Sequence, residues 1–164
     1  MGIGFDAVVG FEAAKLKGLT GLPSYLVAAL KTIFLYFKAP NVRIEFDHEL
    51  IEQPALMVSI MNGRRMGGGF MMAPDGHVDD GLIDVCIANQ VGKLAIFGLI
   101  PKFMKGTQAG DPAIRTLRTQ AITITALAGS ALPAHADGET LCTAGQRLEV
   151  KILPSLIEVV TPLA

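Results

Sequence analysis

The chain has 164 residues, 51% of them hydrophobic, so it is long enough to bury one core and too short for two ordinary domains with a cleft between them. Its 14 Lys and Arg stand against 15 Asp and Glu, and the formal charge of −1 excludes a general basic field for nucleic acid. The 2 cysteines and 3 histidines lack the spacing of a zinc site, which predicts a reduced, cytoplasmic chain without structural zinc.

Two helices are expected at the start of the chain. Residues 6–17 predict the first helix, and Gly18 stands where a glycine stop is common. The second helix should begin near Pro23 and end at Pro40, because hydrophobic residues recur there at helical spacing. This apolar stripe consists of Leu26, Leu30, Ile33, Phe34 and Phe37. The two helices should form a hairpin, joined by residues 18–22.

The most hydrophobic stretch of the chain, residues 22–37, lies in the second of these helices. Pro23 and Lys31 interrupt it, and it falls short of the roughly 20 apolar residues that span a bilayer. The first residues also lack the basic start and the long apolar run of a secretory signal. We therefore expect no membrane-spanning segment.

From Asn41 onward the hydrophobic residues recur with a period of two, which is typical of strands. The expected strands are residues 42–46, 55–61, 69–73, 82–89, 120–127, 131–137, 147–153 and 156–161. The exception is a helix over Lys93–Lys105, which Pro101 should kink or end. The sequence thus predicts a mainly β chain with α: an antiparallel β-sandwich decorated by an N-terminal helical hairpin and one further helix. Residues 156–161 are a candidate open sheet edge, through which isolated chains can form a homodimer.

Glycines precede the first helix in the segment Gly2-Ile3-Gly4-Phe5-Asp6. Such glycines let the backbone approach another group, and a helix N-terminus favours an anion. The simpler interpretation is that Asp6 caps the helix, and the residues alone favour it.

A second glycine-rich segment, residues 62–69, has the sequence NGRRMGGG. Asn62-Gly63 is a strong turn former, and three successive glycines suggest that a ligand or another segment approaches the backbone closely. Arg64 and Arg65 can meet phosphate, although a solvated hairpin tip is the simpler role for them.

An acidic turn follows at residues 73–85, APDGHVDDGLIDV. Its four carboxylates around two glycines can direct one carboxylate and nearby carbonyl oxygens at a hard cation such as Mg²⁺. The spacing is not that of an EF-hand, so a plain acidic turn is the alternative.

Alternating polar side chains occupy residues 135–139, HADGE. An extended backbone would set His135, Asp137 and Glu139 on one face, where a glutamate can accept a proton from an attacking hydroxyl. Spacing alone favours the alternative, an Asp-Gly turn between two strands.

Hydrophobic stripes mark both the second helix and the helix over Lys93–Lys105. Core packing explains such stripes more readily than lipid contact does. Lys93, Lys102 and Lys105 flank the later stripe and would also suit an anionic membrane surface.

Four motifs, taken in order, resemble the C-terminal half of the diacylglycerol-kinase and sphingosine-kinase-like lipid kinases, especially the soluble bacterial ones. They are GIGFDA at 2–7, NG with GGG at 62–69, APDG with DDGLIDV at 73–85 and DGE at 137–139. The likeness covers nearly the whole chain, which is therefore expected to be a single acceptor-side domain over residues 1–164. The resemblance implies a two-domain enzyme whose N-terminal domain binds ATP through a GGDGT-like loop. No such segment occurs here, so we expect the N-terminal nucleotide-binding domain to be absent and the isolated chain to be inactive without it.

The resemblance also implies site residues. The family's Mg²⁺ position falls on the side chain of Asp80 and on the backbone carbonyls of His77 and Leu82. The family's proton acceptor falls on Glu139, with Asp137 beside it.

The reaction that the resemblance implies transfers the γ-phosphate of ATP to the hydroxyl of diacylglycerol or a similar lipid, with Mg²⁺ and ATP as cofactors. The implied partners are a lipid at the inner membrane surface and the nucleotide-binding domain of the same protein. Two alternatives stay open: a non-catalytic lipid- or membrane-binding module, and a related kinase domain that acts on a small molecule such as a dinucleotide.

Overall fold

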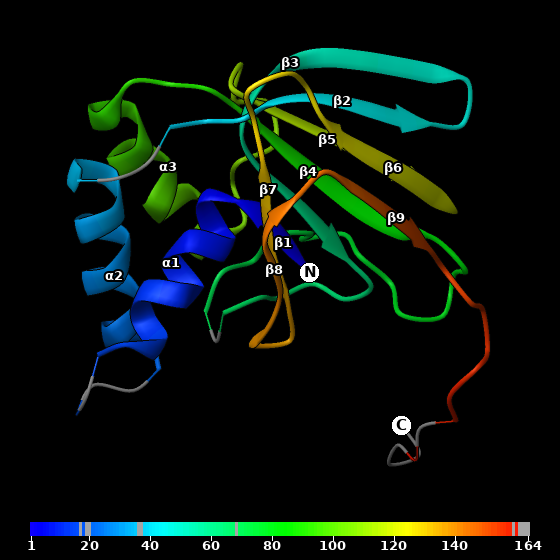
Figure 1. Ribbon diagram of the computed structural model, residues 1–164. Coiled ribbons are helices and arrows are strands. Elements are labelled where there is room, and N and C mark those ends of the chain that lie inside the picture. Colours follow the sequence, from blue (N-terminus) through cyan, green and yellow to red (C-terminus); the bar gives the residue numbers. More distant parts are fainter. Residues whose placement is uncertain (17, 19–20, 36–37, 68, 159, 161–164) are drawn as a thin grey trace.

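The computed structural model describes residues 1–16, 18, 21–35, 38–67, 69–158 and 160. The helices are α1 (Phe5–Ala14), α2 (Leu22–Leu35) and α3 (Lys93–Lys105). The strands are β1 (Gly2–Gly4), β2 (Asn41–Phe46), β3 (Glu49–Met61), β4 (Ile83–Asn89), β5 (Ile114–Thr119), β6 (Ala121–Ala126), β7 (Leu132–Ala136), β8 (Glu139–Gly145) and β9 (Arg147–Lys151). Figure 1 shows the three labelled helices gathered on one side of the strands.

Every strand pair in the described part of the chain is antiparallel, and the strands form two layers that share β3. The first half of β3 pairs with β2, and this layer continues through β6 to β9. The second half of β3 pairs with β4 on one side and with β1 on the other. Strand β4 then pairs with β5, and β1 pairs with β7, which in turn pairs with β8. A register shift between Ala55 and Met57 lies where β3 passes from one layer to the other. The predicted antiparallel β-sandwich with added helices is confirmed.

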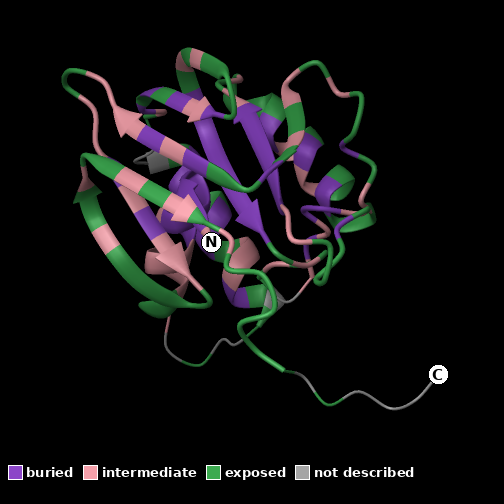
Figure 2. Ribbon diagram, turned by 90° about the vertical axis from the view of Figure 1, so that its right-hand side faces the viewer, coloured by how far each residue is buried: buried purple, intermediate pink, exposed green. Residues whose placement is uncertain are grey.

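Two hydrophobic cores lie on the two faces of the layer that contains β4. The side chains of Val85 and Ile87 enter the core between the two sheets, whereas Cys86 and Ala88 face the helices. Because successive side chains of a strand point to opposite faces, β4 is buried on both sides. Figure 2 shows that buried residues concentrate in the central strands.

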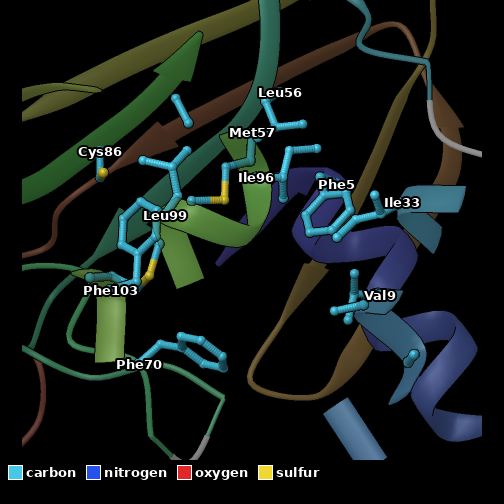
Figure 3. Packing of buried hydrophobic residues seen from close by; sticks show 14 of the residues in the cluster. Phe5, Val9, Ile33, Leu56, Met57, Phe70, Cys86, Ile96, Leu99 and Phe103 are labelled. Carbon is cyan, nitrogen blue, oxygen red and sulfur yellow. The ribbon is translucent and has the colours of Figure 1, made fainter. Parts of the chain in front are cut away.

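The helices cover the face of this layer that lies away from the second sheet. In Figure 3, Leu99 and Phe103 of α3 lie near Met57 of β3, and these residues belong to one core cluster with Phe5 of α1 and Ile33 of α2. None of the described helices is long and apolar enough to cross a membrane.

The structure confirms the predicted helices, but their ends differ from the prediction. Helix α1 ends at Ala14, so Gly18, with φ of 84°, lies in the connection to α2 and does not stop the helix. Helix α2 ends at Leu35, before the expected Pro40. Helix α3 continues past Pro101 and ends where Gly106 adopts the left-handed conformation.

The apolar stripes of α2 and α3 are only partly buried, so core packing explains only part of each. In α2, Ile33 is buried, whereas Leu30 and Phe34 are 44% and 56% exposed; Phe37 lies outside the described residues. In α3, Phe103 is buried while Leu94 is 84% exposed.

The strand predicted over residues 69–73 is wrong. Among the described residues of this range, Phe70 forms an isolated bridge with Met66 and no residue belongs to a strand. The side-chain amide of Gln108 instead donates to two carbonyl oxygens of this segment, at 2.8 and 3.1 Å. A buried side chain thus provides the hydrogen bonds that a neighbouring strand would have provided.

The strand predicted over residues 156–161 is also not found in the described residues of that range. The open edges are instead β5, β8 and β9, because each of these strands has a single partner in the described sheet. The described residues that follow β9 leave the sheet (Figure 1).

Candidate functional site

A groove of about 530 Å³, lined by hydrophobic residues as well as polar ones, lies beside α1, the end of β3 and the hairpin formed by β7 and β8. Arg65, His135, Asp137 and Thr140 line it, together with Tyr25 from α2. The groove therefore gathers hydrogen-bonding and charged groups from segments that are far apart in the sequence.

An apolar crevice of about 50 Å³ adjoins the groove. Tyr25, Met66 and Gly67 line both spaces, so they form a shared wall. Apart from Asp6, the other residues that line the crevice are hydrophobic. Those from α2 and α3 are Leu26, Ala29, Ile96, Leu99, Ile100 and Phe103. Figure 3 shows several of these side chains in the helix-side core.

Asp6 does not cap α1, so that interpretation of the sequence is wrong. The cap position is Gly4, and the Asp6 side chain turns inward, leaving the residue 5% exposed. Its Oδ1 accepts a hydrogen bond from the Tyr25 hydroxyl, and its Oδ2 lies 2.8 Å from Nε2 of His135. Sequence reasoning missed Tyr25 altogether, since no pattern along the chain links it to Asp6.

The glycines before α1 allow close approaches within the chain. A Cβ on Gly4, whose φ is 85°, would lie 2.8 Å from the carbonyl oxygen of Leu56. A Cβ on Gly2 would collide with the Asp6 carboxylate and lie 2.6 Å from Nε2 of His135. The groups that approach these glycines therefore belong to the protein itself.

The strands β7 and β8 are joined by a tight turn at Asp137 and Gly138, whose φ angles are 48° and 88°. Two successive positive φ values are typical of the turns that join antiparallel strands, for which Asp-Gly is a preferred pair. The Asp-Gly turn that spacing favoured is present.

This turn separates the polar residues that an extended chain would have kept on one face. His135 pairs with Thr140 across the hairpin, and both line the groove. Because neighbouring side chains on a strand point to opposite faces, Glu139 points away from the groove, and it is exposed. The structure thus brings His135 and Asp137 together at the groove and leaves Glu139 outside its lining.

The acidic turn contains a cation that sequence reasoning missed, the guanidinium of Arg118 on β5. Its Nε donates to Oδ1 of Asp84 at 2.9 Å, Nη2 donates to the carbonyl of Asp75, and Nη1 lies 3.8 Å from Oδ2 of Asp80. The Asp84 carboxylate raises the pKa of Arg118 above its usual value. Oδ1 of Asp80 accepts the backbone N–H of Leu82 at 2.9 Å, which closes the turn.

The oxygen donors of this turn fit Mg²⁺ in their chemistry. Oδ2 of Asp84 is buried without a hydrogen-bond partner, and a Cβ on Gly76 would lie 3.0 Å from it. No cluster of three His, Cys, Asp or Glu side chains occurs among the described residues, so an ion here would rely on Asp80, carbonyl oxygens and water. Mg²⁺ accepts such a ligand set. Neither His77, Asp80 nor Leu82 lines the groove or the crevice.

Residues 1–161 match the family model described as the YegS C-terminal NAD kinase beta sandwich-like domain. A diacylglycerol kinase of Mycobacterium tuberculosis is 23% identical over 159 residues, which are 97% of this chain and 50% of that protein. A probable lipid kinase, YegS-like, of Pseudomonas aeruginosa is 29% identical over 160 residues, which are 97% of this chain and 51% of that protein. The chain spans about half the length of the curated relatives that it matches.

A crystal structure of a putative diacylglycerol kinase from Bacillus anthracis has a similar fold. Its TM-score is 0.58 at 24% identity, over 87% of this chain and 50% of that chain. At this identity the likeness shows the fold alone. The family model, in contrast, covers nearly the whole sequence, and the chain therefore belongs to the YegS C-terminal family of NAD kinase-like β-sandwich domains.

Proposed function

We propose that this chain is the acceptor-side domain of an ATP-dependent lipid kinase, which transfers the γ-phosphate of ATP to a hydroxyl of diacylglycerol or a similar lipid. The observation that carries the proposal is the apolar crevice that adjoins the larger groove, with its charged and hydrogen-bonding groups, through the shared wall of Tyr25, Met66 and Gly67. An acyl chain needs an apolar space, and the hydroxylated head next to it needs polar groups. Relatives named diacylglycerol kinase and lipid kinase support the same reaction class.

ATP would bind to a second, nucleotide-binding half of the same protein. The relatives are about twice as long as the region they share with this chain, which supports such a half. The GGDGT-like loop implied by the family resemblance is absent from this sequence, so the nucleotide site has to lie elsewhere.

The tip of the β7–β8 hairpin carries the proposed proton transfer. As the lipid oxygen attacks the γ-phosphorus, its proton passes to a carboxylate at the tip, and ADP leaves. The family resemblance makes Glu139 the proposed acceptor, and Asp137, which lines the groove that holds the lipid head, is the second candidate. Glu139 is exposed on the face opposite the groove, whereas Asp137 lines the groove, so the two carboxylates can be distinguished by mutation.

The acidic turn is a proposed Mg²⁺ site, with Asp80 as the carboxylate ligand and His77 and Leu82 as carbonyl ligands. A cation there would neutralise the turn's carboxylates and fix its shape. Arg118 already supplies part of that charge, at 2.9 Å from Asp84 and 3.8 Å from Asp80.

The acceptor lipid resides in a membrane, and the helical layer offers a surface that suits it. Val27, Leu30 and Phe34 recur at helical spacing on α2 and are 43%, 44% and 56% exposed. Lys93 lies beside this stripe, with Nζ donating to the carbonyl of Phe34 at 3.1 Å. Apolar residues next to a lysine are typical of protein surfaces that dock on anionic bilayers. We propose this stripe as the face that meets the membrane.

Labelled phosphate transfer from ATP to diacylglycerol in mixed micelles tests the function in the longer protein that joins this chain to a nucleotide-binding half. Glu139→Gln should lower kcat by a factor of about 100 or more, because general base catalysis contributes roughly that much. Asp137→Asn is the matched variant two residues away. A large loss in Asp137→Asn with full activity in Glu139→Gln would move the proton acceptor to the groove side.

A second pair of variants tests the crevice. Ile100→Trp places a large ring in the crevice lining and should raise KM for diacylglycerol, whereas Leu94→Trp on the exposed face of the same helix should leave it unchanged. Transfer to a soluble dinucleotide, with none to any lipid, would overturn the proposal.

A further inference from the structure

Asp6 is held by two side chains that come from distant parts of the sequence. Tyr25 on α2 donates its hydroxyl proton to one carboxylate oxygen, and Nε2 of His135 on β7 lies 2.8 Å from the other. A carboxylate offers only acceptors, so Nε2 is the donor in this contact. Gly2 has no side chain that could separate Asp6 from His135, since a Cβ there would lie 2.6 Å from Nε2.

The two ends of this chain of contacts reach the two spaces of the proposed lipid site. The Tyr25 ring lies in the shared wall of crevice and groove, with its centroid 5.2 Å from that of Phe70. His135 lines the groove and precedes Asp137 and Glu139 on the same hairpin. Contacts therefore run from the crevice wall, through a buried carboxylate, to the strand that carries the hairpin tip.

The base of the hairpin is anchored in the core by Leu132 and Ala134, but its outer end has fewer fixed points on the rest of the domain. Strand β7 pairs with β1 through only two positions, Gly2 with His135 and Ile3 with Ala134. Strand β8 pairs with β7 alone. His135 is thus the last residue of β7 that pairs with β1, and its side chain is the one that contacts Asp6.

We infer that Tyr25, Asp6 and His135 form a positioning relay, which places the hairpin tip for phosphate transfer when an acyl chain fills the crevice. This inference rests on the proposed function, because it takes the crevice as the acyl-chain site. An acyl chain packed against the Tyr25 ring restricts the rotamers of that ring. The hydroxyl then holds Asp6 in one orientation, and Asp6 holds His135 and the strand that leads to residues 137–139.

The dependence of kcat on acyl-chain length distinguishes this relay from a purely structural contact. In the longer protein with its nucleotide-binding half, kcat should rise from dibutyrylglycerol to dioctanoylglycerol, because a longer chain reaches further from a head group in the groove into the crevice. Tyr25→Phe keeps the ring and removes the hydroxyl. It should lower kcat for dioctanoylglycerol by about tenfold, as misplaced groups do, and lower kcat for dibutyrylglycerol by a clearly smaller factor. Equal loss for both lipids would overturn the relay.

Variants of His135 provide the matched pair. His135→Gln keeps an N–H group near the position of Nε2 and should retain part of the chain-length dependence. His135→Leu removes the donor and should lose that dependence. If both variants behave alike, the contact with Asp6 has no positioning role.

A binding measurement on the 164-residue chain is independent of catalysis. The imidazole nitrogen signals of His135, identified by their loss in His135→Gln, should shift when 1,2-dioctanoylglycerol is added. The shift should disappear in Tyr25→Phe. If the ring signals of Phe70 move while those of His135 do not, the lipid enters the crevice and the relay is refuted, but the proposed function stands. If neither set moves, the crevice is not the acyl-chain site and the relay is refuted. Phosphate transfer to lipid in the longer protein then tests the proposed function separately.

Discussion

Nε of Arg118 donates to Oδ1 of Asp84 at 2.9 Å, and this bond joins β5 to the acidic turn that leads into β4. Asp84 is only 9% exposed, and its other carboxylate oxygen has no hydrogen-bond partner. A buried carboxylate without a donor is costly, so the turn depends on a cation that the chain itself supplies.

Arg118→Leu should lower the free energy of unfolding by about 1–3 kcal/mol, because it leaves the Asp84 carboxylate without its donor. Urea unfolding of the 164-residue chain measures the loss. Arg115→Leu, on the same strand, is the control. Arg115 pairs at 2.5 Å with Glu49, and both side chains are exposed, so its loss should cost less than about 1 kcal/mol. Equal losses would show that burial of Asp84 does not matter.

Mg²⁺ should raise the melting temperature of the chain, and Asp80→Asn should remove that increment. The increment follows because a ligand that binds the folded state stabilises it, and Asp80 is the proposed carboxylate ligand. Melting curves with magnesium chloride and with a chelator provide the measurement. Asp79→Asn, an exposed neighbour, should keep the increment. An undiminished increment in Asp80→Asn would remove this residue from the proposed site.

Two glycines near the start of the chain should respond to alanine with opposite signs. Gly4→Ala should destabilise the fold by about 1–2 kcal/mol or more, because φ is 85° and the new Cβ would lie 2.8 Å from the carbonyl of Leu56. Gly10→Ala lies inside α1 with nothing within 4 Å and should stabilise by about 0.5–1 kcal/mol. Denaturant unfolding of both variants measures the difference, and a loss in Gly10→Ala would contradict the open space around it.

Cys86 should not react with a thiol reagent while the chain is folded. Burial raises the pKa of its thiol to about 12. At pH 8 the thiolate, which is the reactive form, is therefore about one part in 10⁴. A disulfide reagent should label Cys142, which is only partly buried, and should reach Cys86 after denaturation. Rapid labelling of both cysteines in the native chain would contradict the burial of β4.

Phe34→Ser should weaken sedimentation of the chain with vesicles that contain phosphatidylglycerol. The side chain is 56% exposed in the α2 stripe, and its transfer out of water favours docking. Leu141→Ser is the control, since Leu141 is 53% exposed on β8 at the edge of the sheet. If both variants sediment like the unchanged chain, the α2 stripe is not the docking face.

The sequence predicted strands wherever hydrophobic residues alternate strongly, as in Asn41–Phe46, because one face of such a strand enters a core. It missed β5 and β8, whose outer edges are open and whose residues, apart from one in β5, are exposed or half-buried, so little alternation marks them. It also missed β1, which has only three residues, two of them glycine. The first half of β3 was missed as well; its residues are exposed or half-buried, and Pro54 lies within it.

The candidate site shows a similar division. The resemblance identified both Glu139 and Asp137 as site residues. Which of them lines the groove depends on the Asp-Gly turn between the strands, whose two positive φ angles reverse the chain. Asp6 was expected to cap a helix, which is a local role. Its contacts with Tyr25 and His135 arise only when α2 and β7 pack beside α1, so no local pattern could have predicted them.

Strand β4 forms a wall common to both cores, with Val85 on one side and Cys86 on the other. Close packing on both faces means that enlarging or shrinking a side chain toward one core shifts the backbone that supports the other. An engineer who wished to adapt the crevice to a bulkier acceptor should therefore begin with α2 and α3. Their outer faces pack against no other layer of the described chain and can yield, whereas β4 has no side that can be redesigned alone.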